Sequence, residues 1–333
     1  MNSRLISEWQ KQDAIVIAWP NETTDWAENL KDVSKVYFDL ACKIADHQKL
    51  LILSKELNLP EFPNQLKKNI KIVQIDYNDT WTRDYIGLSV EKDNERRIIN
   101  FKFNAWGDKF GSNLDNTVNI QLEKKGLFIK PILNHEEFVL EGGSVEINDQ
   151  NELLTSKQCL LNNNRNPNLN QSQIEQVLKN NLGVKDIIWI ENGEIPGDDT
   201  DAHIDTLARF CNDNTIAYSI DNSIALKSME KELKNKFNKN QILVPLPLPK
   251  PLIHNGNRIP GSYVNFLITN KKVLVPTYND PNDTIAINQL QKLFPNRKIQ
   301  GVNCIELIKQ NGSLHCITMQ IAEGILNLSL WDE

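Results

Sequence analysis

The chain has 333 residues, of which 40% are hydrophobic and 24% charged, so collagen-like and wholly disordered classes are excluded. Its formal net charge of −6 argues against a nucleic-acid-binding protein, because such proteins usually carry a basic face. No apolar run approaches the roughly 18 residues of a membrane span, and the polar N-terminal stretch lacks the apolar core of a signal peptide. We therefore expect a cytoplasmic protein that binds neither nucleic acid nor membrane.

Short apolar runs typical of strands recur along the chain, with helical patterns between some of them. Strands are predicted at residues 14–18, 50–53, 70–75, 97–103, 138–140, 186–190, 215–218, 263–268, 272–275, 298–302 and 316–320. Helices are predicted at residues 29–47, 171–182, 228–237 and 281–293. This mixture predicts an α/β fold. No sequence repeat of fixed period accompanies it, and no linker divides the chain.

Acidic residues are most concentrated in the segment 191–205, which holds six of them and no Lys or Arg. A solvated acidic loop is the simplest interpretation. The segment also contains His203 and Asp205, which would share one face if they lie on a strand. A histidine with several carboxylates can bind a divalent cation, so a metal-dependent hydrolase is an alternative. The spacing does not match an EF-hand loop.

The five cysteines form no CxxC pair, which argues against a disulfide framework and a structural zinc site. Four of them are interpreted as buried structural thiols: Cys42, Cys159, Cys211 and Cys304. Cys316 differs because it follows a Gly-Ser turn, a setting in which a thiol can act as a nucleophile with a distant histidine. His315 would face the other way on a strand, so His203 is the better candidate for the base.

Two further acidic residues adjoin turn or aromatic residues. Glu141 precedes two glycines, where a carboxylate can fix the tautomer of a catalytic histidine, although a plain turn is the alternative. Asp84 follows Trp81 and Arg83, so it could form a structural ion pair with Arg83 or hold a planar cation against Trp81. Asp84 and Asp205 could each make paired hydrogen bonds to a guanidinium group.

Eight motifs, each weak by itself, occur in order over most of the chain. They are Glu8-Trp9 with Ala18-Trp19-Pro20, Trp81-Thr-Arg-Asp84, Phe103-Asn-Ala-Trp-Gly107, Leu140-Glu-Gly-Gly143, Leu161-Asn-Asn-Asn-Arg-Asn166, Gly197-Asp-Asp-Thr-Asp201 with His203-x-Asp205, Tyr263-Val-Asn-Phe266 and His315-Cys-Ile-Thr318. Together they resemble the agmatine deiminase and Porphyromonas-type peptidyl-arginine deiminase family of the guanidine-modifying (pentein) superfamily.

The resemblance implies one catalytic domain over residues 1–333, folded as an α/β propeller of five pseudo-symmetric ββαβ-type modules. It also implies roles for single residues: Cys316 as nucleophile, His203 as general acid/base, Glu141 as the group that orients His203, Asp84 and Asp205 as guanidinium ligands, and Trp81, Asp199 and Asn265 as further substrate-binding residues. No cofactor and no metal are implied. Members of the family are often homodimers, so a second copy of the chain is the expected partner.

The implied reaction is the hydrolysis of agmatine to N-carbamoylputrescine and ammonia through an amidino-thioether on Cys316. The local acidity suits this dication, and no Lys or Arg can be assigned to a substrate carboxylate. A deiminase of peptidyl-arginine or of another guanidino compound is the alternative. An amidinotransferase and a non-catalytic binding protein are less favoured by these motifs. The chain departs from the family pattern at Tyr85-Ile86-Gly87, Ala202, Asn311-Gly312-Ser313 and Met319, and these departures bear on the pocket for the substrate tail.

Overall fold

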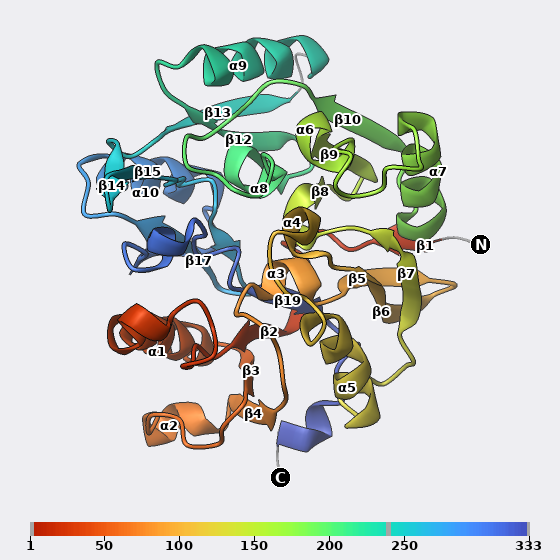
Figure 1. Cartoon of the computed structure of the whole chain (residues 1–333), viewed down its shortest axis with the longest axis vertical. Helices are drawn as coiled ribbons and strands as arrows, with labels where there is room; N and C mark the ends of the chain where they lie inside the picture. The colour runs from red at the N-terminus through yellow and green to blue at the C-terminus, as the bar shows by residue number, and fades with distance from the viewer. Residues whose placement is uncertain (1–2, 238–240, 332–333) are drawn as a thin grey trace.

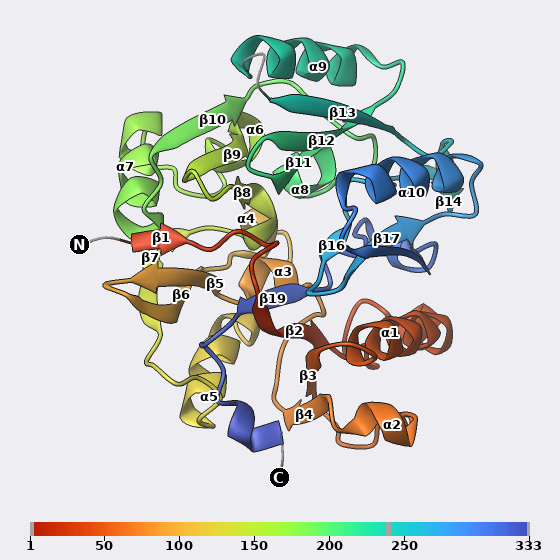
Figure 2. The ribbon, with the colours of Figure 1, turned by 180° about the vertical axis from the view of Figure 1, so that it is seen from behind.

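The computed structural model describes residues 3–237 and 241–331, which form a mixed α/β fold (Figures 1 and 2). Across these residues the strands form five sheets of three or four strands and one two-stranded hairpin. Each of the five sheets contains an antiparallel pair followed by a parallel pair. A helix joins the two parallel strands in every case, since parallel strands need a crossover connection.

The strands of each sheet follow in hydrogen-bonded order: β19 (Met319–Ala322), β2 (Gln12–Ala18), β3 (Lys49–Ser54) and β4 (Ile70–Gln74); β1 (Ser3–Leu5), β5 (Leu88–Lys92), β6 (Glu95–Lys102) and β7 (Leu133–Val139); β10 (Asp186–Ile190), β9 (Glu152–Ser156) and β8 (Val145–Ile147); β11 (Ala208–Asn212), β12 (Thr215–Ile220) and β13 (Ile242–Pro247); β16 (Leu267–Ile268), β17 (Lys272–Thr277) and β18 (Lys298–Asn303). The hairpin is β14 (Leu252–His254) with β15 (Asn257–Ile259).

Helices of two kinds connect the strands. The longer ones are α1 (Leu30–Ala45), α5 (Val118–Lys124), α7 (Gln171–Leu182), α9 (Ile224–Lys236) and α10 (Asn282–Leu293). The short ones are α2 (Asn64–Lys67), α3 (Thr82–Tyr85), α4 (Ala105–Asp108), α6 (Lys157–Leu160), α8 (Ile204–Leu207) and the 3-10 turn η3 (Gly142–Ser144). Figures 1 and 2 show α1, α7, α9 and α10 at the periphery and α3 and α8 nearer the middle. No described helix is both long and apolar enough to cross a membrane.

The four predicted helices are all confirmed. The apolar stripe of α1 is buried, and α7 occupies the predicted range. Helix α9 begins at Ile224, earlier than predicted, because the Ser223 hydroxyl accepts the Leu226 N–H and caps it. Pro281 precedes the first residue of α10.

Two predicted strands are wrong over part of their length. Of residues 263–268 only β16 is a strand, and of residues 316–320 only the start of β19 is one. Side chains replace strand pairing there: the side-chain Oδ1 of Asn265 accepts the His315 N–H at 2.8 Å, and the Thr318 hydroxyl donates to the His315 carbonyl at 3.1 Å. Both segments therefore turn, and Cys316 lies in a turn before β19 instead of on a strand.

The short helices bring the candidate residues together. Helices α3 and α8 both pack against η3, although the three elements are far apart in sequence. Asp84 belongs to α3, Asp205 belongs to α8, and Glu141 precedes η3. The longer helices and the sheets hold these turns in place.

Candidate functional site

The two glycines after Glu141 are the point at which the site is assembled. A Cβ atom on Gly143 would lie 2.6 Å from His203 Nδ1, 3.0 Å from Asp84 Oδ1 and 3.2 Å from Asp205 Oδ2. A Cβ atom on Gly142 would lie 2.2 Å from the Arg83 carbonyl oxygen. Three candidate side chains therefore converge on one glycine, and only residues without a side chain fit at this position.

The expected reason for the proximity of His203 and Asp205 is wrong. His203 is the N-cap of α8 and Asp205 lies within that helix, so the two do not share a face of a strand. Helical backbone brings them to the same place by another route. The hydroxyl of Thr206 donates to the His203 carbonyl at 2.9 Å and holds this turn.

Cys316 is almost fully buried, with 7% of its surface exposed. Its Sγ lies 3.4 Å from Asn265 Nδ2 and 3.5 Å from Asn265 Oδ1. Burial, and then the negative charges of Asp205 and Asp84, raise the pKa of the Cys316 thiol well above its usual value. Cys316 is therefore a thiol at neutral pH in this structure.

The two aspartates differ in the oxygens that they leave available. Asp84 Oδ1 accepts the Gly143 N–H at 2.9 Å, and its Oδ2 accepts the Trp106 indole N–H at 3.0 Å. Burial and the charges of Asp205 and Glu141 raise the pKa of Asp84 well above its usual value. Asp205 Oδ2 lies 2.7 Å from a ring nitrogen of His315, while Oδ1 is buried with no hydrogen-bond partner among the described residues. Paired hydrogen bonds from each carboxylate to a guanidinium stay a prediction.

His203 is also buried, and its Nδ1 lies 3.8 Å from Asp84 Oδ1. Burial lowers the pKa of His203 to about 4, against the opposing effect of Asp205, so its ring is neutral at pH 7. Its Nε2 has no hydrogen-bond partner among the described residues.

Glu141 lies close to His203 without a hydrogen bond between them. Ligand atoms of Glu141, Cys159 and His203 all lie within 4.8 Å of one another. Glu141 Oε1 accepts from Arg165 Nε, while Oε2 has no partner among the described residues. Burial raises the pKa of Glu141, and the Arg165 charge opposes this rise. The role of Glu141 in orienting the His203 ring stays a prediction.

The carboxylates of the acidic segment 191–205 have different partners in the structure. Asp198 accepts from the Thr200 hydroxyl at 2.6 Å and from the Ala202 N–H at 2.7 Å, and Asp201 pairs with Arg165 at 2.9 Å. Asp199 instead faces a cavity. The interpretation as a uniformly solvated acidic loop is therefore wrong for these three residues.

Two groups of possible metal ligands occur within the described ranges. One contains Glu141, Cys159 and His203, and the other contains Glu8, Glu146 and His315. A buried arginine already pairs with a carboxylate in each group: Arg165 with Glu141, and Arg209 with both Glu8 and Glu146. These guanidinium charges would oppose the binding of a metal ion.

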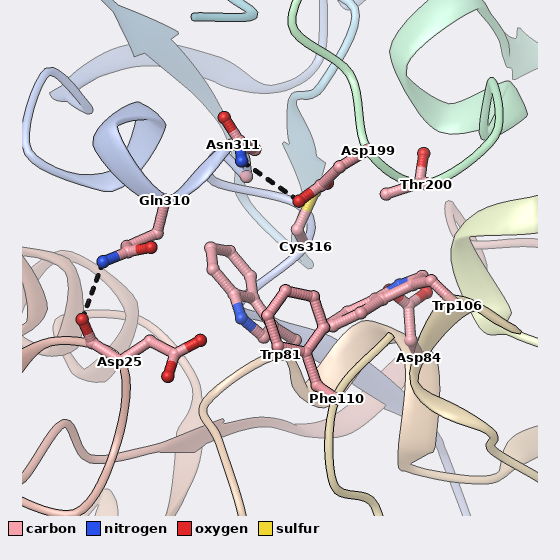
Figure 3. Close-up of a pocket in the computed structure, with 11 residues that line it drawn as sticks. Asp25, Trp81, Asp84, Trp106, Phe110, Asp199, Thr200, Gln310, Asn311 and Cys316 are labelled. Atoms are coloured by element: carbon pink, nitrogen blue, oxygen red, sulfur yellow. Dashed lines mark hydrogen bonds between the residues drawn. The ribbon is translucent and has the colours of Figure 1, made fainter. Parts of the chain in front are cut away.

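The main cavity beside Cys316 has aromatic and acidic walls. Its lining residues are Asp25, Trp81, Asp84, Trp106, Phe110, Asp199, Thr200, Gln310, Asn311, Gly312 and Cys316. The charged side chains among them are all carboxylates. Figure 3 shows Asp199 beside Cys316, the rings of Trp81, Phe110 and Trp106 together, and Asp25 beyond Trp81. A flat cation with a second positive charge is the ligand that these walls suit best.

Asp199 is the acidic group of this cavity that titrates near neutrality. Its Oδ2 accepts from the Asn311 amide at 3.0 Å. Burial raises the pKa of Asp199 to about 6, against the effect of that hydrogen bond. A cation that binds beside Asp199 would favour its ionised form.

A second, smaller cavity adjoins Cys316. Its volume is about 20 Å³, and its lining includes His203, Asp205, Asn265 and Cys316. This volume is enough for about one water molecule. Cys316 therefore lines both the cavity with acidic walls and a small chamber beside the candidate base, as do Thr200 and Asn311.

Four residues of the site carry no assigned role in the sequence analysis: Glu8, Trp106, Arg165 and His315. The first three belong to motifs that were recognised only as family signatures. Trp106 also lies in a run of four residues with positive φ, from Ala105 to Asp108, a type of strain that clusters at functional sites. His315 was set aside because a strand was expected, and the turn invalidates that reason.

Comparison with known proteins gives matches over nearly the whole chain. A family model described as Porphyromonas-type peptidyl-arginine deiminase matches residues 4–322. A curated relative from Vibrio parahaemolyticus, provisionally named agmatine deiminase, is 32% identical over 345 residues that cover 95% of each protein.

Solved structures agree with these matches. A cysteine-to-serine variant of a C. jejuni agmatine deiminase with substrate bound is 39% identical and has a TM-score of 0.90, with 97% of each chain covered. A dimethylarginine dimethylaminohydrolase has a TM-score of 0.52 at 10% identity, covering 93% of this chain and 100% of that one, which shows similarity of fold alone.

Proposed function

The chain belongs to the Porphyromonas-type peptidyl-arginine deiminase family, and from this premise we propose that it is an agmatine deiminase. It hydrolyses the guanidinium group of agmatine to N-carbamoylputrescine and ammonia. The observation that carries the proposal is the cavity beside Cys316, whose charged walls consist of Asp25, Asp84 and Asp199. Agmatine carries a guanidinium at one end and an ammonium at the other, so it complements a cavity of this charge.

The reaction begins with a proton transfer that the substrate makes possible. In the empty site Cys316 is a thiol and His203 is neutral. The guanidinium binds between Asp84 and Asp205, and its positive charge stabilises a thiolate beside it. The thiol proton then moves to His203, which becomes an imidazolium, and Glu141 orients that ring.

Two bond exchanges at the guanidinium carbon complete the reaction. The Cys316 thiolate attacks the carbon and forms a C–S bond. The tetrahedral adduct breaks one C–N bond, and ammonia leaves with the proton from His203. A water molecule then attacks the amidino-thioether while His203 accepts one of its protons. The C–S bond breaks to release the Cys316 thiolate, and the ureido product leaves after the second proton of the water passes to solvent. The His203 proton returns to Cys316.

Asn265 and Trp81 position the reacting groups. The Asn265 amide contacts Cys316 Sγ and donates to the Asp205 carbonyl at 3.4 Å, so it links the nucleophile to α8. Trp81 lies edge-on to Trp106 with ring centroids 6.5 Å apart, and both line the cavity. Their faces suit a flat guanidinium.

We extend the proposal to the architecture and assembly. The five sheets, each with an antiparallel pair followed by a parallel pair, form the blades of one pseudo-symmetric propeller. Residues 1–333 form a single catalytic domain. In support, β19 near one end of the chain pairs with β2 near the other. A homodimer, as is frequent in the family, is the proposed assembly.

The proposed activity is tested by measuring ammonia and ureido product from agmatine, free arginine and a peptidyl-arginine substrate. We expect turnover of agmatine, with a loss of more than about 10³-fold in Cys316→Ser. Cys42→Ser is the matched control, because Cys42 lies on α1, away from the site. Activity that survives in Cys316→Ser contradicts the covalent mechanism. Turnover of peptidyl-arginine alone would favour the alternative substrate.

Asp25 tests the choice of substrate directly. Its side chain is exposed at the cavity, where it can contact the ammonium group of agmatine. We expect Asp25→Asn to raise KM for agmatine by about two- to fivefold, the size of an exposed ion pair, and to leave KM for butylguanidine unchanged. Glu28→Gln, a neighbouring exposed change, is the control. Equal effects on both substrates would show that Asp25 does not bind the tail.

A further inference from the structure

A buried chain of hydrogen bonds lies behind the guanidinium-binding carboxylates. Asp205 Oδ2 lies 2.7 Å from His315 Nδ1, and His315 Nε2 lies 2.8 Å from Glu8 Oε2. All three side chains are buried. Residues from the N-terminal segment, from α8 and from the turn before β19 thus form one triad, which we call the Glu8–His315–Asp205 triad.

The number of protons in this triad follows from its geometry. An ionised carboxylate can only accept hydrogen bonds, so each ring nitrogen of His315 must donate one. A ring with two N–H groups is an imidazolium. The alternative is a neutral ring beside one protonated carboxyl group. In either case two carboxyl groups and one ring share two protons.

The surroundings of Glu8 exclude a proton on that carboxyl group. Glu8 Oε1 accepts the Ile268 N–H at 2.7 Å, and Oε2 accepts from Arg209 at 2.6 Å. Arg209, His315 and Arg83 hold the pKa of Glu8 far below its usual value in spite of burial. Glu8 is therefore an anion.

Asp205 is the other place where the proton could reside. Burial alone would raise the pKa of Asp205, but the hydrogen bond and charge of His315 outweigh this effect and lower it. Burial, Arg209 and Arg83 lower the pKa of His315 itself. The lowered pKa makes Asp205 the second anion of the triad, and two anionic oxygens 2.7 and 2.8 Å from the ring nitrogens each need an N–H to accept, so His315 is an imidazolium.

The triad leaves Asp205 with one available oxygen. Oδ2 is engaged by His315, whereas Oδ1 is buried without a partner among the described residues. A buried anionic oxygen without a hydrogen bond is costly, and a guanidinium N–H would supply that bond. The ring of His315 therefore determines which oxygen of Asp205 faces the substrate.

Glu8 is itself held rigidly. Arg209, which pairs with Glu8, also pairs with Glu146 and donates to the Phe266 carbonyl. Arg83 donates to the His315 carbonyl at 3.4 Å and lies 3.8 Å from Glu8 Oε2, so its ion pair is with Glu8 instead of the neighbouring Asp84. The ring of His315 thus has fixed partners on both sides.

We propose that His315 is an imidazolium stabilised by Glu8 and that it acts as a positioning residue. Its ring keeps Asp205 anionic and directs Asp205 Oδ1 at the guanidinium of the substrate. The inference rests on the proposed function in that Asp205 binds the guanidinium. It adds a charge state and a partner to that site. The charged or titratable groups that surround the triad are Arg83, Asp84, Glu146, His203, Arg209 and Cys316.

The first test is the charge of His315, measured without any substrate. In ¹⁵N-histidine-labelled native protein, we expect one ring to show the two protonated nitrogens of an imidazolium at about pH 7, and His315→Asn assigns that signal by its loss. A neutral His315 ring at this pH overturns the inference, whatever the substrate proves to be.

The second test is the pH profile of kcat/KM. In His315→Asn the new amide can donate to Asp205 but carries no charge. We therefore expect the acidic limb of the kcat/KM profile of this variant to move to higher pH by about one unit. KM for agmatine should rise about tenfold, with a smaller change in kcat. Glu8→Gln should shift the limb in the same direction, and it keeps the test available if the first variant does not fold. His135→Asn, in β7, is the matched control.

The outcomes separate the two proposals. A merely structural role of His315 would lower stability and kcat without moving the acidic limb, and that result overturns the inference. If native protein turns over no guanidine, the proposed function fails, while the charge measurement still decides the state of His315.

Discussion

At the scale of single residues, burial sets the chemistry of the candidate site. The same low-polarity surroundings raise the pKa of Cys316 and lower that of His203, so neither is charged before a cation arrives. The aspartates on either side contribute to the rise at Cys316. A site of this kind is activated by its own substrate, because the guanidinium supplies the missing positive charge.

Asp199 makes this electrostatic account testable by pH. Since its pKa is about 6, Asp199 is ionised above that pH and loses its charge as the pH falls through it. We expect KM for agmatine to rise as the pH is lowered from about 7 to about 5, and we expect Asp199→Asn to have a high KM with little pH dependence in this range. The measurement is steady-state kinetics at each pH.

Butylguanidine serves as the control for this prediction. Asp84 also has a raised pKa, but in the proposed binding mode it faces the guanidinium that both substrates share. Loss of the Asp84 charge would therefore affect both substrates alike, whereas loss of the Asp199 charge should affect agmatine more. A native KM for agmatine that stays constant over this range would contradict the prediction.

At the scale of elements, short turns bear the functional groups and longer elements support them. The strained turn α4 illustrates this division. Gly107 has a φ of +98°, and the indole of Trp106 beside it donates to Asp84. The strain is therefore coupled to the position of a carboxylate that we place against the substrate.

Gly107→Ala should disturb both stability and substrate binding. The added Cβ would lie 2.3 Å from Asn164 Nδ2, and the alanine would have to adopt a positive φ that is unfavourable for it. We expect a loss of about 1–2 kcal/mol in the free energy of unfolding and an increase in KM of about tenfold. Urea unfolding and steady-state kinetics provide the two measurements.

Gly126→Ala is the matched control for this turn. Gly126 also has a positive φ, of +75°, but a Cβ there would meet nothing within 4 Å. This variant should show the cost of backbone strain with KM unchanged. If the two variants had the same KM, α4 would not position Asp84.

At the scale of the whole molecule, the two ends of the chain are joined in one sheet. Val16 of β2 pairs with Met319 of β19, which follows the turn that carries Cys316. Asp13 strengthens this junction, because its Oδ2 accepts the N–H groups of Ile325 at 2.9 Å and Leu326 at 2.8 Å. The position of Cys316, the candidate nucleophile, thus depends on contacts between the first and last parts of the chain.

Asp13→Ala tests how much this junction contributes to the free energy of unfolding. Removal of a buried acceptor leaves two backbone N–H groups without a partner, so we expect a loss of about 1–3 kcal/mol in the free energy of unfolding. The measurement is urea unfolding, with Asp186→Ala as the control because Asp186 is exposed at the start of β10. Equal midpoints for the two variants would show that the junction contributes little.

Local features of the fold were readable from the sequence. The four helices and most strands follow from apolar periodicity and turn residues, because these depend on neighbours within a few positions. Cys316, His203, Glu141, Asp84 and Asp205 were identified by residue type and motif order, and the structure places them in one region. The two segments that turn where strands were predicted are exceptions, since hydrogen bonds from side chains satisfy backbone groups there in place of strand pairing.

The sequence by itself determined the α/β class, the helices, the family and the candidate catalytic residues, because each of these is encoded in residue types and spacings along the chain. Only the tertiary structure decided that Glu8 and His315 form a triad with Asp205, that Arg165 holds Glu141, and that Trp106 contacts Asp84. These contacts join residues as much as 307 positions apart, and hydrogen-bond geometry and burial exist only once the chain has folded. The charge of each group at the site follows from those contacts, so it could not be read before them.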